Sequence, residues 1–289
     1  MQLKEQLRWA VAQLTPSTTE SPRLDAELLL CHLLGKSRSW LHTWPDQPLT
    51  AALEPLFRQL VERRRSGEPI AHLLGSQSFW SLDLKVTADT LIPRPDTERL
   101  IEQALLFIPE HQPWQVADLG TGTGAIAIAI ATERPDCSII ATDQSLAALN
   151  VARENSQRYP SANLSFRSGS WFEPLQGEHF ELILSNPPYI AEEDPHLTQG
   201  DLRFEPGNAL VSGVRGMDDL QQIISTAPDH LHPNGILLVE HGYDQGKEVR
   251  SLFTENDYHT IKTRRDLGGE ERITYGTQSS QDHGLQNNA

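Results

Sequence analysis

Residues 118–124 read Asp-Leu-Gly-Thr-Gly-Thr-Gly, between a short apolar run at 115–119 and the segment Ala125–Ala131. The apolar run has the length of a buried strand, and a segment directly after a glycine loop is better read as a helix. Alternating glycines let the chain turn tightly and let a ligand approach the backbone, while the helix N-terminus offers unpaired N–H groups. This stretch predicts the first strand–loop–helix unit of an α/β fold.

Three more apolar runs follow, at 138–142, 180–185 and 235–240, and helical stretches lie between them at 146–159 and 217–231. Short buried strands that alternate with helices indicate a mostly parallel sheet covered on both faces. We therefore predict a Rossmann-like α/β domain whose ligand lies at the carboxyl ends of the strands.

The kind of ligand is suggested by Asp143, which ends the next predicted strand after Asp118. A carboxylate there can accept both hydroxyls of a ribose. Gly120, Gly122 and Ala125 also satisfy the dinucleotide pattern G-x-G-x-x-G/A. The loop alone therefore leaves open a dinucleotide, S-adenosylmethionine, or a turn that merely packs a helix on a strand.

A second motif, Asn-Pro-Pro-Tyr at 186–189, follows the predicted strand 180–185. Two prolines cannot continue a central strand, because they donate no ladder hydrogen bonds. They predict a rigid turn at the rim of the sheet. We expect it to present the side-chain oxygen of Asn186 and the carbonyl of Pro187 as two fixed acceptors, which makes these the candidate catalytic residues. Pro188 and the flat ring of Tyr189 would complete the substrate site.

Two fixed acceptors suit methylation of a planar amide or amino nitrogen, whose lone pair is delocalised. Both N–H groups need oriented acceptors, and the nitrogen gains positive charge as the methyl arrives, so the acceptors stabilise the transition state more than the ground state. Alignment of nitrogen, methyl and sulfur supplies much of the remaining acceleration. Read alone, Asn-Pro is also the mark of an ordinary turn.

The chain divides into four predicted segments. Residues 1–72 are predicted to be a helical bundle, 73–89 a β-hairpin linker, 90–277 the α/β domain and 278–289 a flexible tail. The bundle is indicated by the stretch from Pro22 to Gly35, where a proline suits the first helical turn, apolar residues recur at spacings of three and four, and glycine ends the helix.

Composition narrows the function classes. The 289 residues carry a net charge of -15, and residues 1–89 hold ten basic and ten acidic side chains, so the acidic excess lies entirely beyond them. An acidic surface repels a phosphate backbone, so stable nucleic-acid binding is not expected. The longest apolar run is too short to span a membrane, and the N-terminus lacks a signal-peptide pattern. Two cysteines without metal-ligand spacing indicate a reducing cytoplasm and no metal site.

Residues 118–124, Asp143, 186–189 and the helical N-terminal segment together resemble the protein-(glutamine-N5) methyltransferases that modify peptide-chain release factors. The resemblance extends over about residues 1–276. Further stretches support it: Pro22-Arg23-Leu24-Asp25-Ala26-Glu27, Arg64-Arg65, Gly67-Glu68-Pro69-Ile70-Ala71, Ile92-Pro93-Arg94-Pro95-Asp96-Thr97-Glu98 and Arg203-Phe204-Glu205-Pro206.

The resemblance implies a methyltransferase domain with a mostly parallel seven-stranded sheet at 90–277 and a substrate-docking domain at 1–72. It implies S-adenosylmethionine as methyl donor, with S-adenosylhomocysteine as product. The implied acceptor is the glutamine of a Gly-Gly-Gln tripeptide in a release factor, and its methylation supports translation termination. The implied cofactor-binding residues are Gly120, Thr121, Gly122, Thr123, Gly124, Asp143, Trp171 and Asn186. The chain departs from the family at Ser170, where relatives often carry Asp.

Two other functions stay open at this point. A nucleic-acid adenine or guanine amino methyltransferase would use the same Asn-Pro-Pro-Tyr chemistry, with base flipping and a basic groove. A binding module would hold a nucleoside as ligand or regulator without turnover. Incubation with labelled cofactor and either a release factor or DNA distinguishes a release-factor methyltransferase from a nucleic-acid methyltransferase. Substitution of Asn186 distinguishes an enzyme, which should lose most of its rate, from a binding module, which has no rate to lose.

Overall fold

The computed structural model describes residues 1–17, 19–159 and 163–279, and these form two compact units. The first comprises Met1–Gln77, Val86–Ala88 and Pro195–Glu205, and the second comprises the other described residues. The chain therefore passes from one unit to the other several times. The predicted functional boundaries at 72, 89 and 277 stay predictions.

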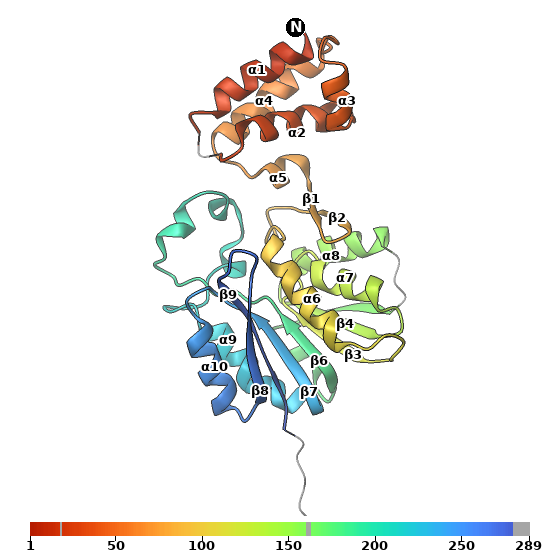
Figure 1. Cartoon of the computed structure of the whole chain (residues 1–289), viewed down its shortest axis with the longest axis vertical. Helices are drawn as coiled ribbons and strands as arrows, with labels where there is room; N and C mark the ends of the chain where they lie inside the picture. The colour runs from red at the N-terminus through yellow and green to blue at the C-terminus, as the bar shows by residue number, and fades with distance from the viewer. Residues whose placement is uncertain (18, 160–162, 280–289) are drawn as a thin grey trace, which may run out of the picture. The chain divides into compact units, whose positions relative to one another are not determined.

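The first unit is a helical bundle, as predicted (Figure 1). Its helices are α1 (Leu3–Leu14), α2 (Pro22–Leu34), α3 (Arg38–Thr43), α4 (Leu53–Arg65) and α5 (Ile70–Leu74). Leu29, Leu30 and Phe57 form part of a fully buried apolar core. Helix α2 begins with a proline and ends at Gly35, which adopts the left-handed conformation with φ of 59°. Both ends match the sequence signals that predicted this helix.

A partly buried arginine joins distant parts of the first unit. Arg64, near the end of α4, donates from Nε to Oδ2 of Asp25 over 2.7 Å and from Nη1 to the carbonyl of Glu68 over 2.9 Å. Its Nη1 also lies 3.5 Å from Oδ1 of Asp201, and Arg203 donates to the carbonyl of Ser66. The segment 195–205 is thus held to the N-terminal helices, although more than a hundred residues of sequence separate them.

The second unit is built on a seven-stranded sheet in the order β5-β4-β3-β6-β7-β9-β8. The strands are β3 (Gln115–Leu119), β4 (Ser138–Asp143), β5 (Leu164–Ser168), β6 (Phe180–Ser185), β7 (Leu231–Glu240), β8 (His259–Arg265) and β9 (Glu271–Thr277). The first five in this order pair in parallel, whereas β9 pairs antiparallel with both β7 and β8. This confirms the predicted Rossmann-like, mostly parallel sheet. A separate two-stranded sheet of β1 (Ser76–Phe79) and β2 (Leu82–Lys85) confirms the predicted hairpin.

Helices cover both faces of the sheet, as predicted (Figure 1). They are α6 (Glu98–Phe107), α7 (Ala125–Glu133), α8 (Leu146–Arg158), α9 (Asp218–Thr226) and α10 (Gly246–Glu255). In β6, Leu182 and Leu184 share a buried cluster with α6 and α7, whereas Ile183 shares one with α9 and α10. Both faces of the strand are apolar, because alternate residues point to opposite faces.

The predicted end of one helix and the predicted start of one strand were wrong. The helix predicted over 217–231 ends at Thr226 and continues as a 3-10 turn, Ala227–His230, because Pro228 has no N–H for a further α-helical bond. The strand predicted from Gly235 begins at Leu231, since an irregular segment precedes the regular pairing with β6.

Helix α6 offers a direct test of which apolar residues stabilise the fold. Ile101 is fully buried between α6 and the sheet, whereas Leu106 is 79% exposed on the same helix. Ile101→Ala should lower the free energy of unfolding by about 2–5 kcal/mol, because it leaves a cavity. Leu106→Ala should change it by less than about 0.5 kcal/mol. Urea denaturation followed by circular dichroism compares the two, and equal losses would contradict the packing described.

Of the tail predicted from Gln278, only Gln278 and Ser279 are described. The N–H of Gln278 donates to the carbonyl of Gly235 over 2.8 Å, so the chain is still paired there. Residues 280–289 lie outside the described residues. Over the described ranges, no helix combines the length and apolar character that crossing a bilayer requires.

Candidate active site

The sheet register brings the two sequence motifs together. Leu119, the last residue of β3, pairs with Thr142 in β4 on one side and with Ser185 in β6 on the other. The hydroxyl of Ser185 donates to the carbonyl of Leu119 over 2.9 Å. Because parallel strands end at one edge, the glycine loop, Asp143 and the Asn-Pro-Pro-Tyr corner all begin at neighbouring positions.

A pocket in the second unit opens at this edge. Its lining includes most of the predicted site residues, namely Gly120, Thr121, Gly122, Thr123, Asp143, Trp171, Asn186 and Pro188. Gly124, Pro187 and Tyr189 lie outside this lining. Residues outside the two sequence motifs also contribute, among them Thr90, Thr97 and Ser145.

The glycine loop is shaped for a close approach. Gly120 has φ of 71°, and a Cβ added there would lie 3.2 Å from the ring of Trp171. Gly124 has φ of 81°, and a Cβ there would lie 3.0 Å from Ile128 and 3.2 Å from Ala152. Gly120 thus keeps the pocket open beside the indole, while Gly124 lets α7 and α8 pack closely.

The two aspartates of the predicted site have different surroundings. Asp118 is fully buried, accepts a 2.6 Å hydrogen bond from the Thr121 hydroxyl, and burial raises its pKa to about 7. It braces the loop without lining the pocket. Asp143 lines the pocket and accepts from the N–H of Gly122 over 2.9 Å and of Ser145 over 2.8 Å. Each of its oxygens retains a lone pair for a ligand hydroxyl.

Trp171 lies beside the glycine loop in a strained backbone conformation. Its φ is 45°, and its carbonyl accepts from the Thr142 hydroxyl over 3.3 Å. Ser170, beside it, also lines the pocket, and its N–H donates to Glu173. A non-glycine residue in the left-handed region is held there by its surroundings, which here present the indole to Gly120.

The Asn-Pro-Pro-Tyr corner is oriented by two partners that the sequence did not reveal. Nδ2 of Asn186 donates to the hydroxyl oxygen of Thr97 over 3.0 Å, and Oδ1 accepts no hydrogen bond from any described residue. The hydroxyl of Tyr189 donates to Oε1 of Glu240 over 3.3 Å. The motif therefore offers the amide oxygen of Asn186 to the pocket, whereas the phenol of Tyr189 points to Glu240.

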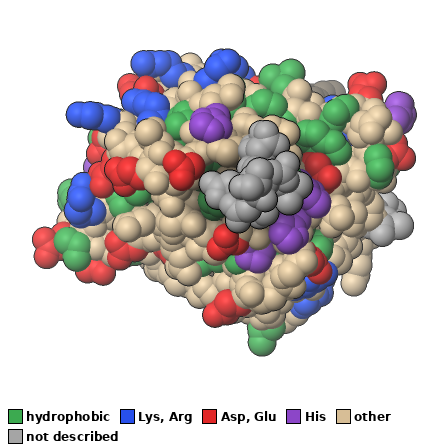
Figure 2. Space-filling view, turned by 90° about the horizontal axis from the view of Figure 1, so that it is seen from below, with side chains coloured by type: hydrophobic (Ala, Val, Ile, Leu, Met, Phe, Trp, Pro, Cys, Tyr) green, Lys and Arg blue, Asp and Glu red, His purple; other side chains and the backbone are tan. Residues whose placement is uncertain are grey.

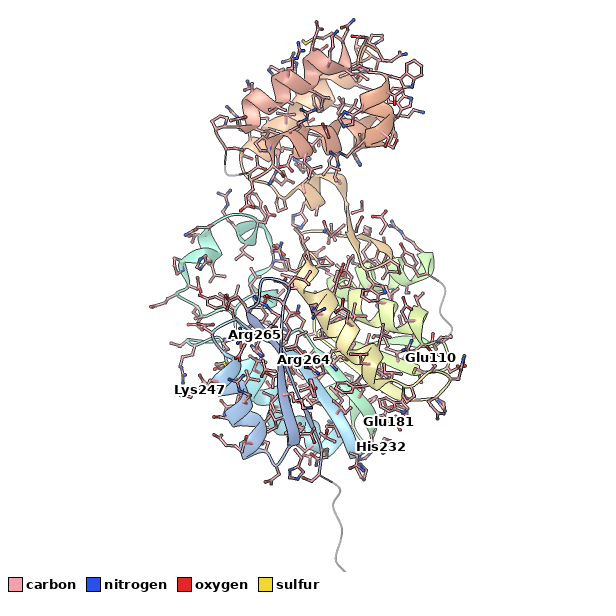
Figure 3. The ribbon with its side chains drawn as sticks, in the orientation of Figure 1. Glu110, Glu181, His232, Lys247, Arg264 and Arg265 are labelled. Atoms are coloured by element: carbon pink, nitrogen blue, oxygen red, sulfur yellow. The ribbon has the colours of Figure 1, made fainter. Side chains whose placement is uncertain are left out.

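The charge around the pocket is not that of a nucleic-acid site. The charged residues in its lining are Asp89, Arg94, Asp143 and Asp219, so acidic groups dominate. Lys247, Arg264 and Arg265 are carried by α10 and β8 (Figure 3), and neither element contributes to the lining. Figure 2 shows a face on which acidic side chains lie among basic ones.

Histidines gather away from the pocket. His232 and Glu181 lie at the amino ends of β7 and β6 (Figure 3), with 3.8 Å between Nε2 and Oε1, and the ring of His179 is 5.7 Å from that of His232. Over residues 1–17, 19–159 and 163–279, no three His, Cys, Asp or Glu side chains are arranged to hold a metal.

Comparisons with known proteins first define the class. A family model of the methyltransferase small domain matches residues 101–202, and one of the PrmC N-terminal domain matches residues 5–75. A solved methyltransferase from Pyrococcus furiosus has the same fold, with a TM-score of 0.53 at 19% identity over 77% of this chain and 98% of its own. The fold of the second unit is that of a methyltransferase.

Full-length relatives then define the family. The release factor glutamine methyltransferase of Xylella fastidiosa is 50% identical over 92% of this chain and 97% of its own. That of Escherichia coli K12 is 50% identical over 96% of this chain and 99% of its own. The chain belongs to the release factor glutamine methyltransferase family, as its sequence resemblance predicted, and the nucleic-acid alternative is not favoured.

Proposed function

We propose that this chain transfers the methyl group of S-adenosylmethionine to N5 of the glutamine in the Gly-Gly-Gln tripeptide of peptide-chain release factors. Family membership supports the reaction class. The observation that carries the chemistry is the orientation of Asn186, whose nitrogen is held by Thr97 and whose Oδ1 is left to the pocket. A glutamine amide needs such an acceptor for its N–H.

The residues present fit S-adenosylmethionine. Gly120 leaves room beside the Trp171 ring, and Asp143 presents a carboxylate with spare acceptor capacity for a ribose. We assign cofactor contacts to Gly120, Thr121, Gly122, Thr123, Asp143, Trp171 and Asn186, with Gly124 shaping the loop behind them. When bound, the cofactor supplies an electrophilic methyl group on a sulfonium.

The corner would act by positioning and electrostatics. Oδ1 of Asn186 and the carbonyl oxygen of Pro187 accept the two amide N–H groups of the glutamine, and Pro188 and Tyr189 shape the rim. As the nitrogen becomes positive, both acceptors bind it more tightly, which lowers the barrier. The proton becomes acidic only after the methyl is bound, so no strong base is needed beforehand. The proposal uses no metal.

We assign recognition of the release factor as a protein to the first unit, which the PrmC N-terminal domain model matches. Its charge is balanced, in contrast to the acidic remainder of the chain. Both cysteines, Cys31 and Cys137, are free and buried, which is consistent with the cytoplasm as its compartment.

The test is mass spectrometry of a purified release factor after incubation with the chain and S-adenosylmethionine. We expect one added methyl group on the Gly-Gly-Gln glutamine, and none when that glutamine is replaced by alanine. Docking by the first unit predicts that the whole release factor is a better acceptor than a short peptide carrying the tripeptide. Methylation of DNA, with the release factor unmodified, would overturn the proposal in favour of the nucleic-acid alternative.

A further inference from the structure

A glutamine outside the pocket lining holds the last residue of the Asn-Pro-Pro-Tyr corner. Gln245 lies in the loop between β7 and α10, directly before that helix, which carries Lys247 in Figure 3. Its Nε2 donates to the carbonyl oxygen of Tyr189 over 2.9 Å and to that of Gly216 over 3.1 Å. Its Oε1 accepts from the N–H of Gly242 over 2.7 Å. One side chain thus joins three stretches of backbone, and one of them is the corner.

These hydrogen bonds determine which way the Gln245 amide faces. An amide group has two N–H donors and an acceptor oxygen, and all of them are used here. Turned over, the amide would place its oxygen against two carbonyl oxygens and its NH2 group against an N–H. A side chain with two donors and one acceptor is therefore what these three backbone groups require.

The surrounding backbone leaves room for this arrangement. Gly216 has φ of 70°, and a Cβ added there would lie 2.3 Å from the carbonyl oxygen of Tyr189 and 3.0 Å from Nε2 of Gln245. A Cβ added at Gly242 would lie 3.0 Å from Oε1 of the same side chain. Glycine at both positions thus permits the close approach of the loops and the glutamine.

The two prolines make the corner dependent on contacts of this kind. Residues 187–188 have no backbone N–H, so neither can anchor the turn by donating a hydrogen bond. After the corner, Ile190 pairs with the backbone of residues 210–212 through both its N–H and its carbonyl. The carbonyl of Tyr189, between the prolines and this pairing, is the group that Gln245 holds.

The prolines also transmit a displacement of Tyr189 to the carbonyl of Pro187. The ring of Pro188 fixes its φ, and the backbone of Pro187 is restricted because a proline follows it. The carbonyl of Pro187 therefore turns together with the residues after it, instead of adjusting separately.

We propose that Gln245 is a positioning residue for methyl transfer, which fixes the backbone of the corner at Tyr189 and so the direction of the Pro187 carbonyl. The proposal rests on the proposed function, in which that carbonyl and Oδ1 of Asn186 accept the two N–H groups of the substrate amide. It assigns a role to a residue that lies outside the pocket lining and 56 positions after Tyr189 in the sequence.

The first kinetic test is Gln245→Met, which keeps the length of the side chain and removes its donors and its acceptor. We expect kcat to fall about ten- to a hundredfold, because a small misplacement of a reacting group has an effect of this size. The Kd for S-adenosylmethionine should be unchanged, and the KM for the release factor should change by less than kcat. Gln222→Met, at an exposed glutamine on α9, is the matched control and should keep the wild-type kcat.

Gln245→Glu distinguishes positioning from packing by its pH dependence. The ionised carboxylate still accepts from Gly242 but places an oxygen against the carbonyls of Tyr189 and Gly216. When protonated, the introduced group donates to one of these carbonyls, as the amide does, and both its burial and the carbonyls raise its pKa. The ratio of its kcat to that of the wild type should therefore rise about tenfold as the pH falls from about 8 to about 5.5.

The ratio to the wild type isolates the introduced group. The titratable and charged side chains nearest to it on the joined segments are His241, Asp244, Tyr189, Glu271, and Arg215 paired with Glu248 over 2.7 Å. All of these are present in both proteins, so their own titrations cancel when the two rates are compared at the same pH. A wild-type kcat in Gln245→Met, or a ratio that does not rise on acidification in Gln245→Glu, would overturn the proposal.

A second readout needs no turnover. Tyr189-Ile190 is the one Tyr-Ile step in the sequence, so carbon-13 in tyrosine carbonyls and nitrogen-15 in isoleucine label a single peptide group for NMR. Its carbonyl signal should move in Gln245→Met, which loses the hydrogen bond, and stay in place in Gln222→Met. An unmoved signal in Gln245→Met would contradict the role of Gln245. If the signal moves but the wild type methylates no release factor, the proposed function fails while the hold of Gln245 on the corner stands.

Discussion

Asn186→Ala should nearly abolish methyl transfer while leaving the affinity for S-adenosylmethionine within a small factor of the wild type. The change removes the acceptor that tightens on the nitrogen as it becomes positive, and loss of one such group lowers kcat about 10²–10³-fold. Most of the fold should be unaffected, because the one hydrogen bond lost is that from Nδ2 to Thr97. Single-turnover kinetics and calorimetric cofactor titration measure the two quantities separately.

Asn150→Ala is the matched control, since Asn150 is exposed on α8 and its amide oxygen accepts from Arg153 on the same helix. It should leave both quantities unchanged. A pure nucleoside-binding module has no rate to lose, so a measurable loss in Asn186→Ala also separates enzyme from binder. A wild-type rate in Asn186→Ala would show that Asn186 takes no part in methyl transfer.

Asp143→Ala should weaken S-adenosylmethionine binding about a hundredfold, which corresponds to about 2.7 kcal/mol. The carboxylate anchors the N–H groups of Gly122 and Ser145, and both hydrogen bonds are charge-assisted. Its loss would remove the proposed ribose acceptor and loosen the glycine loop together. Equilibrium titration with the cofactor measures the effect.

Asp136→Ala provides the comparison for that variant, because Asp136 is exposed and lies near the opposite end of the same strand. We expect no change in affinity there. Burial raises the pKa of Asp143 above that of an exposed aspartate, so the wild-type affinity should also decline on acidification, as the ribose acceptor is neutralised. An affinity that is the same in Asp143→Ala as in the wild type would place the nucleoside elsewhere.

Much of the second unit could be predicted because short stretches of its sequence determine the local secondary structure. The glycine loop at 120–124 and the apolar runs of β3, β4 and β6 determine strand, turn and helix over a few residues each. The helix α7 was predicted from its place after the loop, although its alternating Ala and Ile pattern resembles a strand. Its Ala125–Ala131 segment is buried throughout, which explains the lack of a polar face.

Other strands lacked such signals. β5 shows no fully buried residue, and β8 is an edge strand with mostly exposed side chains, so neither forms an apolar run. Their positions follow from pairing with β4 and β9, which depends on residues distant in sequence. A pattern confined to one segment could not have located them.

The site was predicted only in part, because some of its residues follow predicted strands and others are brought in from distant parts of the sequence. Asn186 and Asp143 follow strands directly, so the topology alone places them at one edge. A turn 89 residues earlier brings Thr97 to Asn186, and the neighbouring strand β7 brings Glu240 to Tyr189. That the ring of Tyr189 faces the substrate stays a prediction, and the hydrogen bond from its hydroxyl to Glu240 could not be read from the sequence.

The segment Pro195–Glu205 has a consequence for how the molecule is made. It belongs to the first unit, where Asp201 lies beside Arg64, yet it is encoded within the sequence of the second. During synthesis from the N-terminus, the helices α1 to α5 emerge long before this segment does. The N-terminal unit therefore cannot reach its final packing until residue 205 has emerged from the ribosome, by which time β3 to β6 have already emerged.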